Sequence, residues 1–181
     1  MTASLPGSLF RAYDIRGIYE DTLTLDNAER IGRAIGEAAR EQDASPVAVG
    51  RDGRLSGPDL LDALARGIQA AGADVVDIGV VPTPVLYFAT HELEGVRSGV
   101  MVTGSHNPPE YNGFKIVIDG TTLSGEAIQD LKTRAERSPA ADQPGRRERA
   151  EVLPAYLDRV VEGHPAPRSM KVVVDCGNGV A

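Results

Sequence analysis

The residues with the clearest chemical potential are gathered in one loop, Thr103–Lys115, which reads TGSHNPPEYNGFK. Gly104 allows the backbone to adopt strained angles beside Ser105. Pro108 keeps the residue before it out of the helical region, and Pro109 stiffens the turn further. The pattern predicts a rigid platform that presents one serine hydroxyl.

Two neighbours of Ser105 bear on what its hydroxyl can do. His106 stands beside it, and the reversal predicted at Asn112–Gly113 brings Lys115 back on the following strand. A serine needs activation to act as a nucleophile, or phosphorylation to act as a phosphoryl donor. Lys115 can neutralise an anionic oxygen in either case. The residue types alone also leave open an ordinary surface turn.

Two common chemistries do not fit this loop. The hydrolase pattern Gly-x-Ser-x-Gly fails because position 107 is Asn, and adjacent Ser and His residues seldom form an acyl-transfer pair. The nucleotide-binding pattern Gly-x-x-x-x-Gly-Lys-Ser/Thr does not occur in the sequence. A serine hydrolase is kept as an alternative interpretation. Labelling of Ser105 by a fluorophosphonate probe would support it.

The elements that must position the loop alternate along the chain between apolar strands and amphipathic helices. Asp26, with Glu29 three residues later, is typical of a helix start, and a second helix is predicted between Ser56 and Gly72. This alternation predicts an α/β fold with a mixed, mostly parallel sheet flanked by helices. Strands are expected at 47–49, 74–78, 99–102, 114–118 and 170–175, and further helices at 85–91, 124–137 and 152–162.

Loops at the carboxyl ends of parallel strands usually hold the chemistry of such sheets. Three loops qualify here, at 50–57, 79–84 and 103–113. Positive charge for an anionic partner is available from Arg11, Arg16, Arg51, Arg54 and Lys115. Of these, Arg51 and Arg54 are interpreted as solvated loop ends rather than catalytic groups.

The organisation along the chain predicts more than one domain. A first domain is expected at 9–137, and a linker at 138–150, because that stretch is rich in Pro and charged residues and has no apolar period. Residues 151–181 are interpreted as the truncated start of a second α/β domain.

Composition excludes several classes of protein. The 181 residues are 41% apolar and 25% charged, which is typical of a globular chain. A net charge of −7 disfavours a nucleic-acid binder or a basic membrane-surface protein, and no stretch approaches the ~20 apolar residues of a membrane span. The single cysteine, Cys176, cannot form an internal disulfide, and no secretory signal is evident. A cytoplasmic location is therefore expected.

Four segments in order along the chain resemble motifs of the α-D-phosphohexomutase superfamily, in its bacterial phosphomannomutase/phosphoglucomutase branch. The serine loop at 103–115 is the most specific of them. The others are FRAYDIRG at 10–17, GRDGRLSG at 50–57, and VVDCGNG at 173–179, which resembles the start of the family's second domain. The resemblance spans almost the whole chain and implies the fold of the family's first domain.

The resemblance implies an intramolecular phosphotransferase that interconverts hexose 1-phosphate and hexose 6-phosphate, with mannose or glucose as the sugar. Ser105 matches the family's phosphoserine, which gives a hexose 1,6-bisphosphate intermediate. Arg16 and Lys115 match positions that bind the substrate and neutralise phosphoryl charge. His106 matches a catalytic position, and Tyr13 a substrate-binding one. A phosphorylated hexose is thus the expected partner, with neither nucleic acid nor membrane.

The resemblance also implies Mg²⁺ as cofactor, held in part by the phosphoryl group on Ser105, and a hexose 1,6-bisphosphate as activator. The family's aspartate-rich metal loop would lie beyond residue 181, and no Asp-Gly-Asp-Gly-Asp occurs in the sequence. The 181-residue chain alone is therefore expected to have no mutase activity. Asn107 is expected to fix the loop by hydrogen bonds to the backbone.

Two alternatives stay open beside this interpretation. One is a phosphoglucosamine mutase, whose first motif usually reads FGTDGIRG, whereas 11–13 here is Arg-Ala-Tyr. The other is a non-catalytic phosphate-binding or regulatory fragment, against which the intact Ser105, His106 and Lys115 argue.

Overall fold

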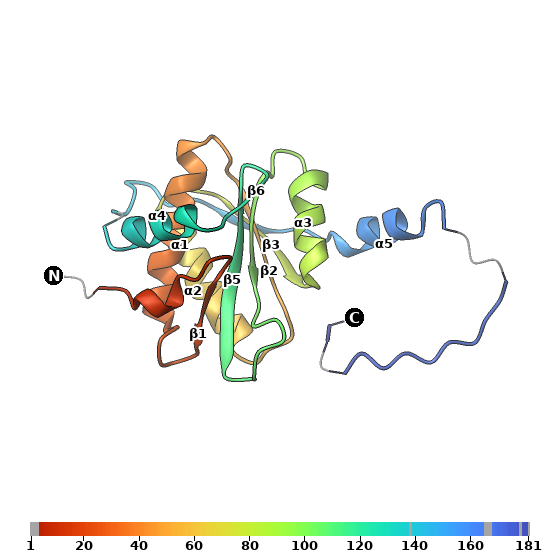
Figure 1. Ribbon diagram of the computed structural model, residues 1–181. Helices are drawn as coiled ribbons and strands as arrows, with labels where there is room; N and C mark the ends of the chain where they lie inside the picture. The colour runs from red at the N-terminus through yellow and green to blue at the C-terminus, as the bar shows by residue number, and fades with distance from the viewer. Residues whose placement is uncertain (1–3, 138, 165–167, 178, 181) are drawn as a thin grey trace.

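A central β-sheet organises the molecule in the computed structural model, which describes residues 4–137, 139–164, 168–177 and 179–180 (Figure 1). The sheet has seven strands, in the order β1-β5-β4-β2-β3-β7, with β6 paired to β5. The strands are β1 (Ile15–Ile18), β2 (Val47–Arg51), β3 (Val75–Val80), β4 (Ser98–Val102), β5 (Tyr111–Ile118), β6 (Thr121–Thr122) and β7 (Arg147–Arg149).

The strand directions explain where the site forms. Strands β4, β2, β3 and β7 are parallel neighbours, whereas β5 runs antiparallel to both β4 and β1. The prediction of a mixed, mostly parallel α/β sheet is confirmed. The antiparallel β5 makes the segment between β4 and β5 a hairpin connection, so the serine loop is anchored by a strand at each end.

Five α-helices and a short 3-10 helix surround the sheet within the described residues. They are η1 (Gly7–Leu9), α1 (Leu25–Glu41), α2 (Gly57–Ala70), α3 (Thr83–Glu92), α4 (Glu126–Ala135) and α5 (Leu153–Val161). The first α-helix begins one residue before the predicted Asp26, because the Thr24 side chain accepts a hydrogen bond from the Asn27 N–H.

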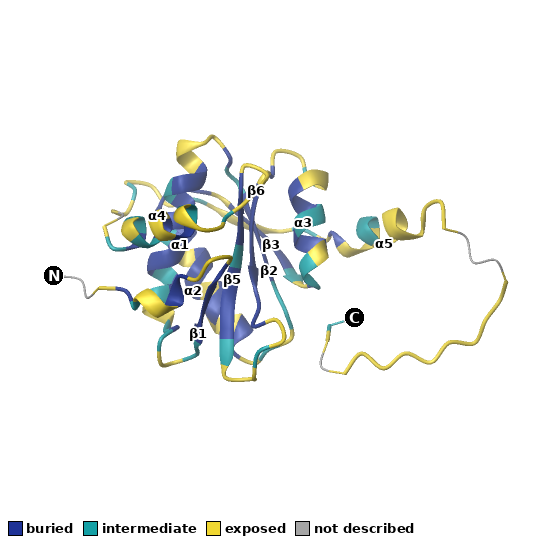
Figure 2. Ribbon diagram, viewed as in Figure 1, coloured by how far each residue is buried: buried dark blue, intermediate teal, exposed yellow. Residues whose placement is uncertain are grey.

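The helices form layers on the two faces of the sheet. Helices α1, α2 and α4 cover one face, with Phe114 fully buried beneath them, and α3 packs on the other (Figure 2). Helices α1 and α2 approach so closely that a Cβ at Gly67 would lie 1.9 Å from the Glu29 carbonyl oxygen. Only glycine fits at that crossing, which brings the two helices together over the sheet.

The segment predicted as a linker, 138–150, differs from that expectation. The Ala141 and Gly145 N–H groups donate to the carbonyls of Ala70 and Gln69, and the segment continues into β7, which pairs with β3. Backbone hydrogen bonding does not require the apolar period whose absence suggested a linker, so β7 adds an edge strand made of charged residues.

The part of the chain after β7 packs much less. None of the residues of α5 is buried, although the rings of Phe88 and Tyr156 meet edge to face, with centroids 5.5 Å apart. The strand predicted at 170–175 does not form, because no described strand pairs with it, and its residues are exposed (Figure 2). Val173, for example, is 90% exposed.

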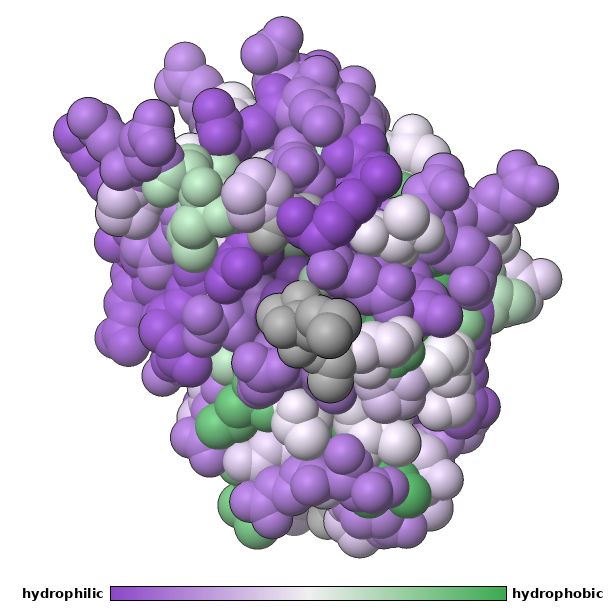
Figure 3. Space-filling view, turned by 90° about the vertical axis from the view of Figure 1, so that its left-hand side faces the viewer, coloured by the Kyte–Doolittle hydropathy of each residue, from purple (hydrophilic) through white to green (hydrophobic). Residues whose placement is uncertain are grey.

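The outer face around the N-terminal segment, α1 and α4 is largely hydrophilic (Figure 3). Arg134 of α4 lies 3.2 Å from Glu37 and 2.8 Å from Glu41 of α1, so ion pairs join the two helices at their solvent side. Among the residues that the structure describes, no helix combines the length and the apolar character needed to cross a bilayer.

Candidate active site

The loops that follow β2, β3 and β4 meet around one cavity of about 770 Å³. The loop after β2 contributes Asp52 and Arg54, the loop after β3 contributes Pro82, and the serine loop contributes Ser105. Val180, from the C-terminal segment, also lies at its wall. Each of the three loops singled out from the sequence, 50–57, 79–84 and 103–113, thus contributes residues to this cavity.

Ser105 has an unusual backbone conformation at this cavity. Its φ angle is +52°, in the left-handed region that non-glycine residues seldom adopt. The Ser105 N–H donates to the Thr103 hydroxyl at 2.8 Å, and that hydroxyl donates to Asp52 Oδ2 at 2.7 Å. Ser105 is exposed and lines the cavity, so the strained backbone presents its side chain at the cavity wall.

The structural reason for glycine at position 104 differs from the backbone strain expected from the sequence. The positive φ falls on Ser105 and not on Gly104, so backbone strain is not what requires glycine there. A Cβ at Gly104 would lie 2.4 Å from Arg54 Cζ and 2.7 Å from the Tyr111 carbonyl oxygen. The glycine therefore makes room for the guanidinium of Arg54 against the loop backbone.

Arg16 and Lys115 lie on adjacent strands, on the sheet face opposite α1, α2 and α4. The pairing of β1 with β5 places Arg16 opposite Gly113, two residues before Lys115. Arg16 Nη1 donates to the Gly104 carbonyl at 3.2 Å, and its Nη2 pairs with Asp14. Lys115 Nζ lies 3.8 Å from the same carboxylate. Asp14 thus holds both cations beside the base of the serine loop.

The remaining predicted residues are less tightly held. His106 Nδ1 lies 3.3 Å from Ser105 Oγ, and the ring is exposed. Tyr13 is 77% exposed, in the segment that leads into β1. The Asn107 side chain donates to the Gly104 carbonyl at 3.1 Å, which agrees with the expected loop-fixing role. Ser105 and Asn107 line the cavity itself, whereas Arg16, Lys115, His106 and Tyr13 do not.

Sequence reasoning missed the two residues that support the loop from β2. Arg54, interpreted as a solvated loop end, is largely buried and donates to four backbone carbonyls of the serine loop: those of Ser105, Asn107, Pro108 and Tyr111. Asp52 accepts from Thr103 and pairs with Arg54 at 3.5 Å. The available signal was an Asp-x-Arg sequence directly after a strand, at the sheet edge where the serine loop also begins.

The described residues do not assemble a metal site by themselves. They contain no group of three or more His, Cys, Asp or Glu side chains placed to hold a metal ion. Two carboxylates at the base of the serine loop are already engaged, Asp14 by Arg16 and Lys115 and Asp52 by Arg54 and Thr103. A phosphoryl group on Ser105 would add a candidate ligand.

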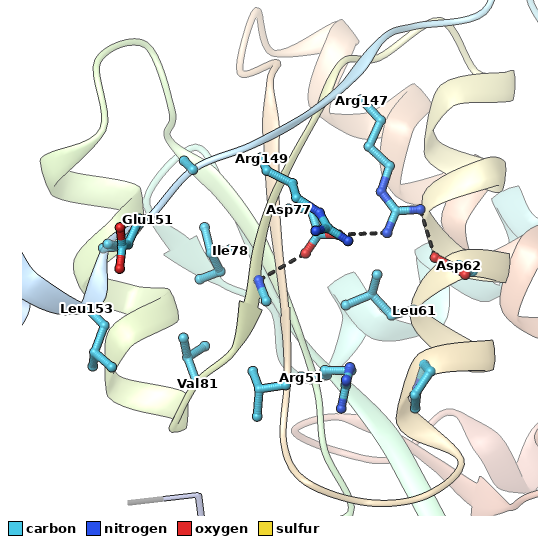
Figure 4. A pocket seen from close by; sticks show the side chains of 15 residues that line it. Arg51, Leu61, Asp62, Asp77, Ile78, Val81, Arg147, Arg149, Glu151 and Leu153 are labelled. Atoms are coloured by element: carbon cyan, nitrogen blue, oxygen red, sulfur yellow. Dashed lines mark hydrogen bonds and ion pairs between the residues drawn. The ribbon is translucent and has the colours of Figure 1, made fainter.

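A second cavity, of about 720 Å³, lies over β3 and β7 (Figure 4). Arg147 crosses it and donates to Asp77 and Asp62, each at 2.7 Å. Burial lowers the pKa of Arg147, but the hydrogen bonds to the two carboxylates outweigh that effect, so the pKa is raised. The Gly79 N–H donates to the other oxygen of Asp77 at 2.9 Å. Arg147 is thus shared between two carboxylates and joins β7 to β3 and α2.

Comparison with known proteins agrees with this architecture. Residues 7–142 match the family model described as "Phosphoglucomutase/phosphomannomutase, alpha/beta/alpha domain I". Over 178 residues, the chain is 54% identical to a "Phosphomannomutase/phosphoglucomutase" from Pseudomonas aeruginosa, covering 98% of this chain and 38% of that protein. It is 48% identical to a "Phosphoglucomutase" from Neisseria gonorrhoeae, covering 98% of this chain and 39% of the relative.

A solved structure is similar as well. The crystal structure of a phosphoglucomutase/phosphomannomutase family protein from Burkholderia thailandensis superposes with a TM-score of 0.85 at 47% identity, covering 91% of this chain and 37% of that one. The chain therefore spans well under half the length of the relatives that it matches.

Proposed function

Because this chain belongs to the phosphoglucomutase/phosphomannomutase family, which it matches through domain I, we propose that it carries the phosphoserine of a phosphohexomutase. The protein would interconvert hexose 1-phosphate and hexose 6-phosphate, with mannose or glucose as the sugar. Family membership supports the reaction class, and the geometry at Ser105 supports the role of this domain in it.

One observation carries the proposal: an exposed serine hydroxyl is held at the mouth of a cavity by a loop with a strained backbone. The φ of +52° at Ser105 is maintained by the hydrogen bonds through Thr103 to Asp52. Strained backbone conformations persist where surrounding contacts fix them, and they cluster at functional sites. Phosphoryl transfer depends mostly on positioning and charge neutralisation, which such a loop supplies.

In the proposed reaction, a sugar hydroxyl attacks the phosphorus of phosphorylated Ser105. The bond between phosphorus and Ser105 Oγ breaks, and a hexose 1,6-bisphosphate forms. The other phosphate of this intermediate then returns to Ser105 Oγ, which regenerates the phosphoserine and releases the isomeric monophosphate. The hydroxyl proton of the sugar is lost in the first transfer, and His106, 3.3 Å from Ser105 Oγ, is the nearest imidazole able to accept or relay it.

Arg16 and Lys115 are proposed to stabilise charge on the transferred phosphoryl group. A phosphoserine carries about −1.5 to −2 charge, so an anionic substrate needs nearby cations before it can approach. Lys115 keeps donors free, because its described ion pair with Asp14 is long, at 3.8 Å. Arg16, by contrast, is buried and shared between Asp14 and the Gly104 carbonyl. Its contribution is therefore more to the loop base than to the substrate.

Mg²⁺ stays a proposal drawn from the family resemblance. When bound, it would act as a Lewis acid on a phosphoryl oxygen. The phosphoryl group of Ser105 would be one ligand for it; Asp14 and Asp52 are engaged in ion pairs, and the described residues contain no group of three or more metal-ligating side chains.

The test follows the phosphoryl group. The protein encoded by the complete gene is mixed with glucose 1,6-bisphosphate labelled in both phosphates and with magnesium. We expect acid-stable label on one peptide, with the added mass of one phosphoryl group at Ser105. Glucose 1-phosphate and mannose 1-phosphate are then supplied separately, and formation of the 6-phosphates is measured.

Ser105→Ala serves as the mapping control, because it removes only the accepting oxygen. A wild-type protein that never acquires label, under conditions where a phosphohexomutase relative does, would refute the phosphoserine role. Label without turnover of either monophosphate would instead favour a different sugar, such as glucosamine phosphate. A folded protein that binds the monophosphates but takes no label would indicate a phosphate-binding module.

A further inference from the structure

The guanidinium of Arg54 is fully committed to the backbone of the serine loop. Its Nη1 donates to the carbonyls of Pro108 at 2.7 Å and Tyr111 at 2.9 Å. Its Nη2 donates to the carbonyls of Ser105 at 3.0 Å and Asn107 at 2.5 Å. With Nε paired to Asp52 at 3.5 Å, each of its three nitrogens has a partner.

This arrangement brings four carbonyl oxygens of one loop toward a single planar cation. Carbonyl dipoles that converge in this way repel one another unless a cation lies between their oxygen ends. A guanidinium offers five N–H donors in a fixed plane, whereas a lysine ammonium offers three around one point. The loop backbone is thus folded around a shape that arginine alone supplies, and Gly104 leaves the space for it.

The same saturation argues against a role of Arg54 in holding substrate phosphate. Its donors are used, its side chain is only 16% exposed, and its charge is opposed by Asp52. Binding a phosphate would require it to release at least one loop carbonyl. Lys115 carries its ion pair with Asp14 at the longer distance of 3.8 Å and is 30% exposed.

We propose that Arg54 is a positioning residue that fixes the peptide following Ser105, and thereby the direction in which the Ser105 hydroxyl is presented. The Ser105 carbonyl bound to Arg54 and the Ser105 N–H bound to Thr103 clamp the residue from both sides. These two clamps maintain the positive φ, and both trace to the β2 loop through Asp52 and Arg54. The catalytic consequence rests on the proposed phosphoserine function; the structural one does not.

The test compares Arg54→Lys with Arg97→Lys in the protein encoded by the complete gene. Arg97 is a matched control, because it also pairs with an aspartate, Asp119, and donates to a carbonyl, that of Asp43, but far from the cavity loops. Two quantities are measured: steady-state kinetics with a hexose 1-phosphate, and hydrogen exchange of the loop amides of Ser105, Asn107 and Tyr111, whose acceptors lie within the loop.

For Arg54→Lys we expect kcat to fall by about 100-fold, the scale of a small misplacement of a reacting group, with KM changed by less than about threefold. The three loop amides should exchange at least about tenfold faster, while amides of β2 and β4 and the melting temperature stay near wild type. Arg97→Lys should leave both the kinetics and the loop amides unchanged.

The outcomes separate this inference from the proposed function. An Arg54→Lys protein with wild-type kcat and wild-type loop exchange overturns the inference, and a selective rise of KM with kcat retained overturns it in favour of phosphate binding by Arg54. If the wild type itself shows neither label nor turnover, the phosphoserine function fails. Loop exchange then still decides whether Arg54 fixes the loop.

Discussion

Two cavities of this domain, the one beside Ser105 and the one over β3 and β7, are similar in size and differ in what their arginines bind. One has a volume of about 770 Å³ and the other about 720 Å³, and an Arg–Asp ion pair stands in the wall of each. Beside Ser105, Arg54 directs its donors to backbone carbonyls and so shapes a loop. Over β3 and β7, Arg147 directs its donors to two carboxylates and so links the elements that carry them (Figure 4).

Cavity volume and the presence of an Arg–Asp ion pair therefore do not by themselves identify a functional site. In the first cavity the buried ionic groups hold a hydroxyl in a strained and exposed conformation. In the second they satisfy one another and join β7 to the rest of the sheet. We therefore expect substitutions in the first cavity to change catalysis, and substitutions in the second to change stability.

The largest expected effect is that of Ser105→Ala on turnover. Without the hydroxyl no phosphoserine forms, and kcat/KM of the complete gene product should fall to background, by about 10⁴-fold or more. The exposed side chain makes few contacts, so the melting temperature should stay near that of wild type. Retained turnover would contradict the claim that the first cavity holds the reacting group.

Lys115→Met should have the next largest effect. Removal of a cation beside the transferred phosphoryl group should lower kcat/KM by about 100-fold. Lys115→Arg keeps the charge on a longer and planar group, so it should recover part of that loss. Equal losses in both variants would mean that Lys115 acts through packing rather than through charge.

In the second cavity, Arg147→Met should destabilise the domain and leave kinetics unchanged. Asp77, whose side chain is 7% exposed, would lose its ion-pair partner and keep only the hydrogen bond from the Gly79 N–H, and removal of one member of a buried pair is costly. Because Arg147 itself is 29% exposed, we expect a loss of about 2 kcal/mol in the free energy of unfolding, measured by urea denaturation.

Arg149→Met is the matched control on the same strand. No ion pair of Arg149 is found among the described residues, so its loss should change the unfolding free energy by less than about 0.5 kcal/mol. If Arg147→Met changes kcat/KM more than twofold, the second cavity takes part in catalysis and the contrast between the two cavities fails.

The smallest effect concerns a carboxylate outside both cavities. The Ser4 hydroxyl donates to Glu136 at 2.8 Å and outweighs the opposing effect of burial, so the pKa of Glu136 is lowered. A lowered pKa in the folded state contributes stability that is complete above the ordinary pKa and is lost as the pH falls through the folded value. The carboxyl carbon shift of Glu136, followed by NMR from pH 7 to 3, should show a midpoint below 4.5.

Ser4→Ala should move that midpoint upward, while the kinetics measured at pH 7 stay as in wild type. A Glu136 midpoint at or above 4.5 in the wild type would show that the N-terminal segment does not dock on α4 through this contact.

Much of the fold could be predicted because its elements are periodic and long. The apolar faces of α1 and α2 and the short buried runs of β2, β3 and β4 are visible in the sequence. Strands β1 and β7 are not, because β1 is four residues long with one arginine and β7 is three residues long with two, and each pairs with a neighbouring strand. The strand predicted at 170–175 failed for the converse reason: its residues suit a strand, but no described neighbour pairs with it.

The site was predicted as a set of loops and one hydroxyl, and less well as a set of contacts. Resemblance and residue type both pointed to Ser105, whose role stays a prediction. The hydrogen bonds from Arg54 to the serine loop could not be inferred, because the sequence does not distinguish a solvent-exposed arginine from one that donates to several backbone carbonyls. Only the fold reveals that the loop after β2 reaches the turn at 107–111, more than fifty residues away.

The hairpin between β4 and β5 constrains how this protein can change over evolution. Thr103 N–H donates to the Gly113 carbonyl at 2.9 Å, and Lys115 stands opposite Met101. Side chains alternate between the two faces of a strand, so an insertion or deletion of a single residue that slipped β5 by one position would exchange Lys115 with Phe114, sending a charge into the core and a phenyl ring to solvent. Changes in the length of the loop are therefore restricted to those that leave the pairing of β5 with β4 unshifted.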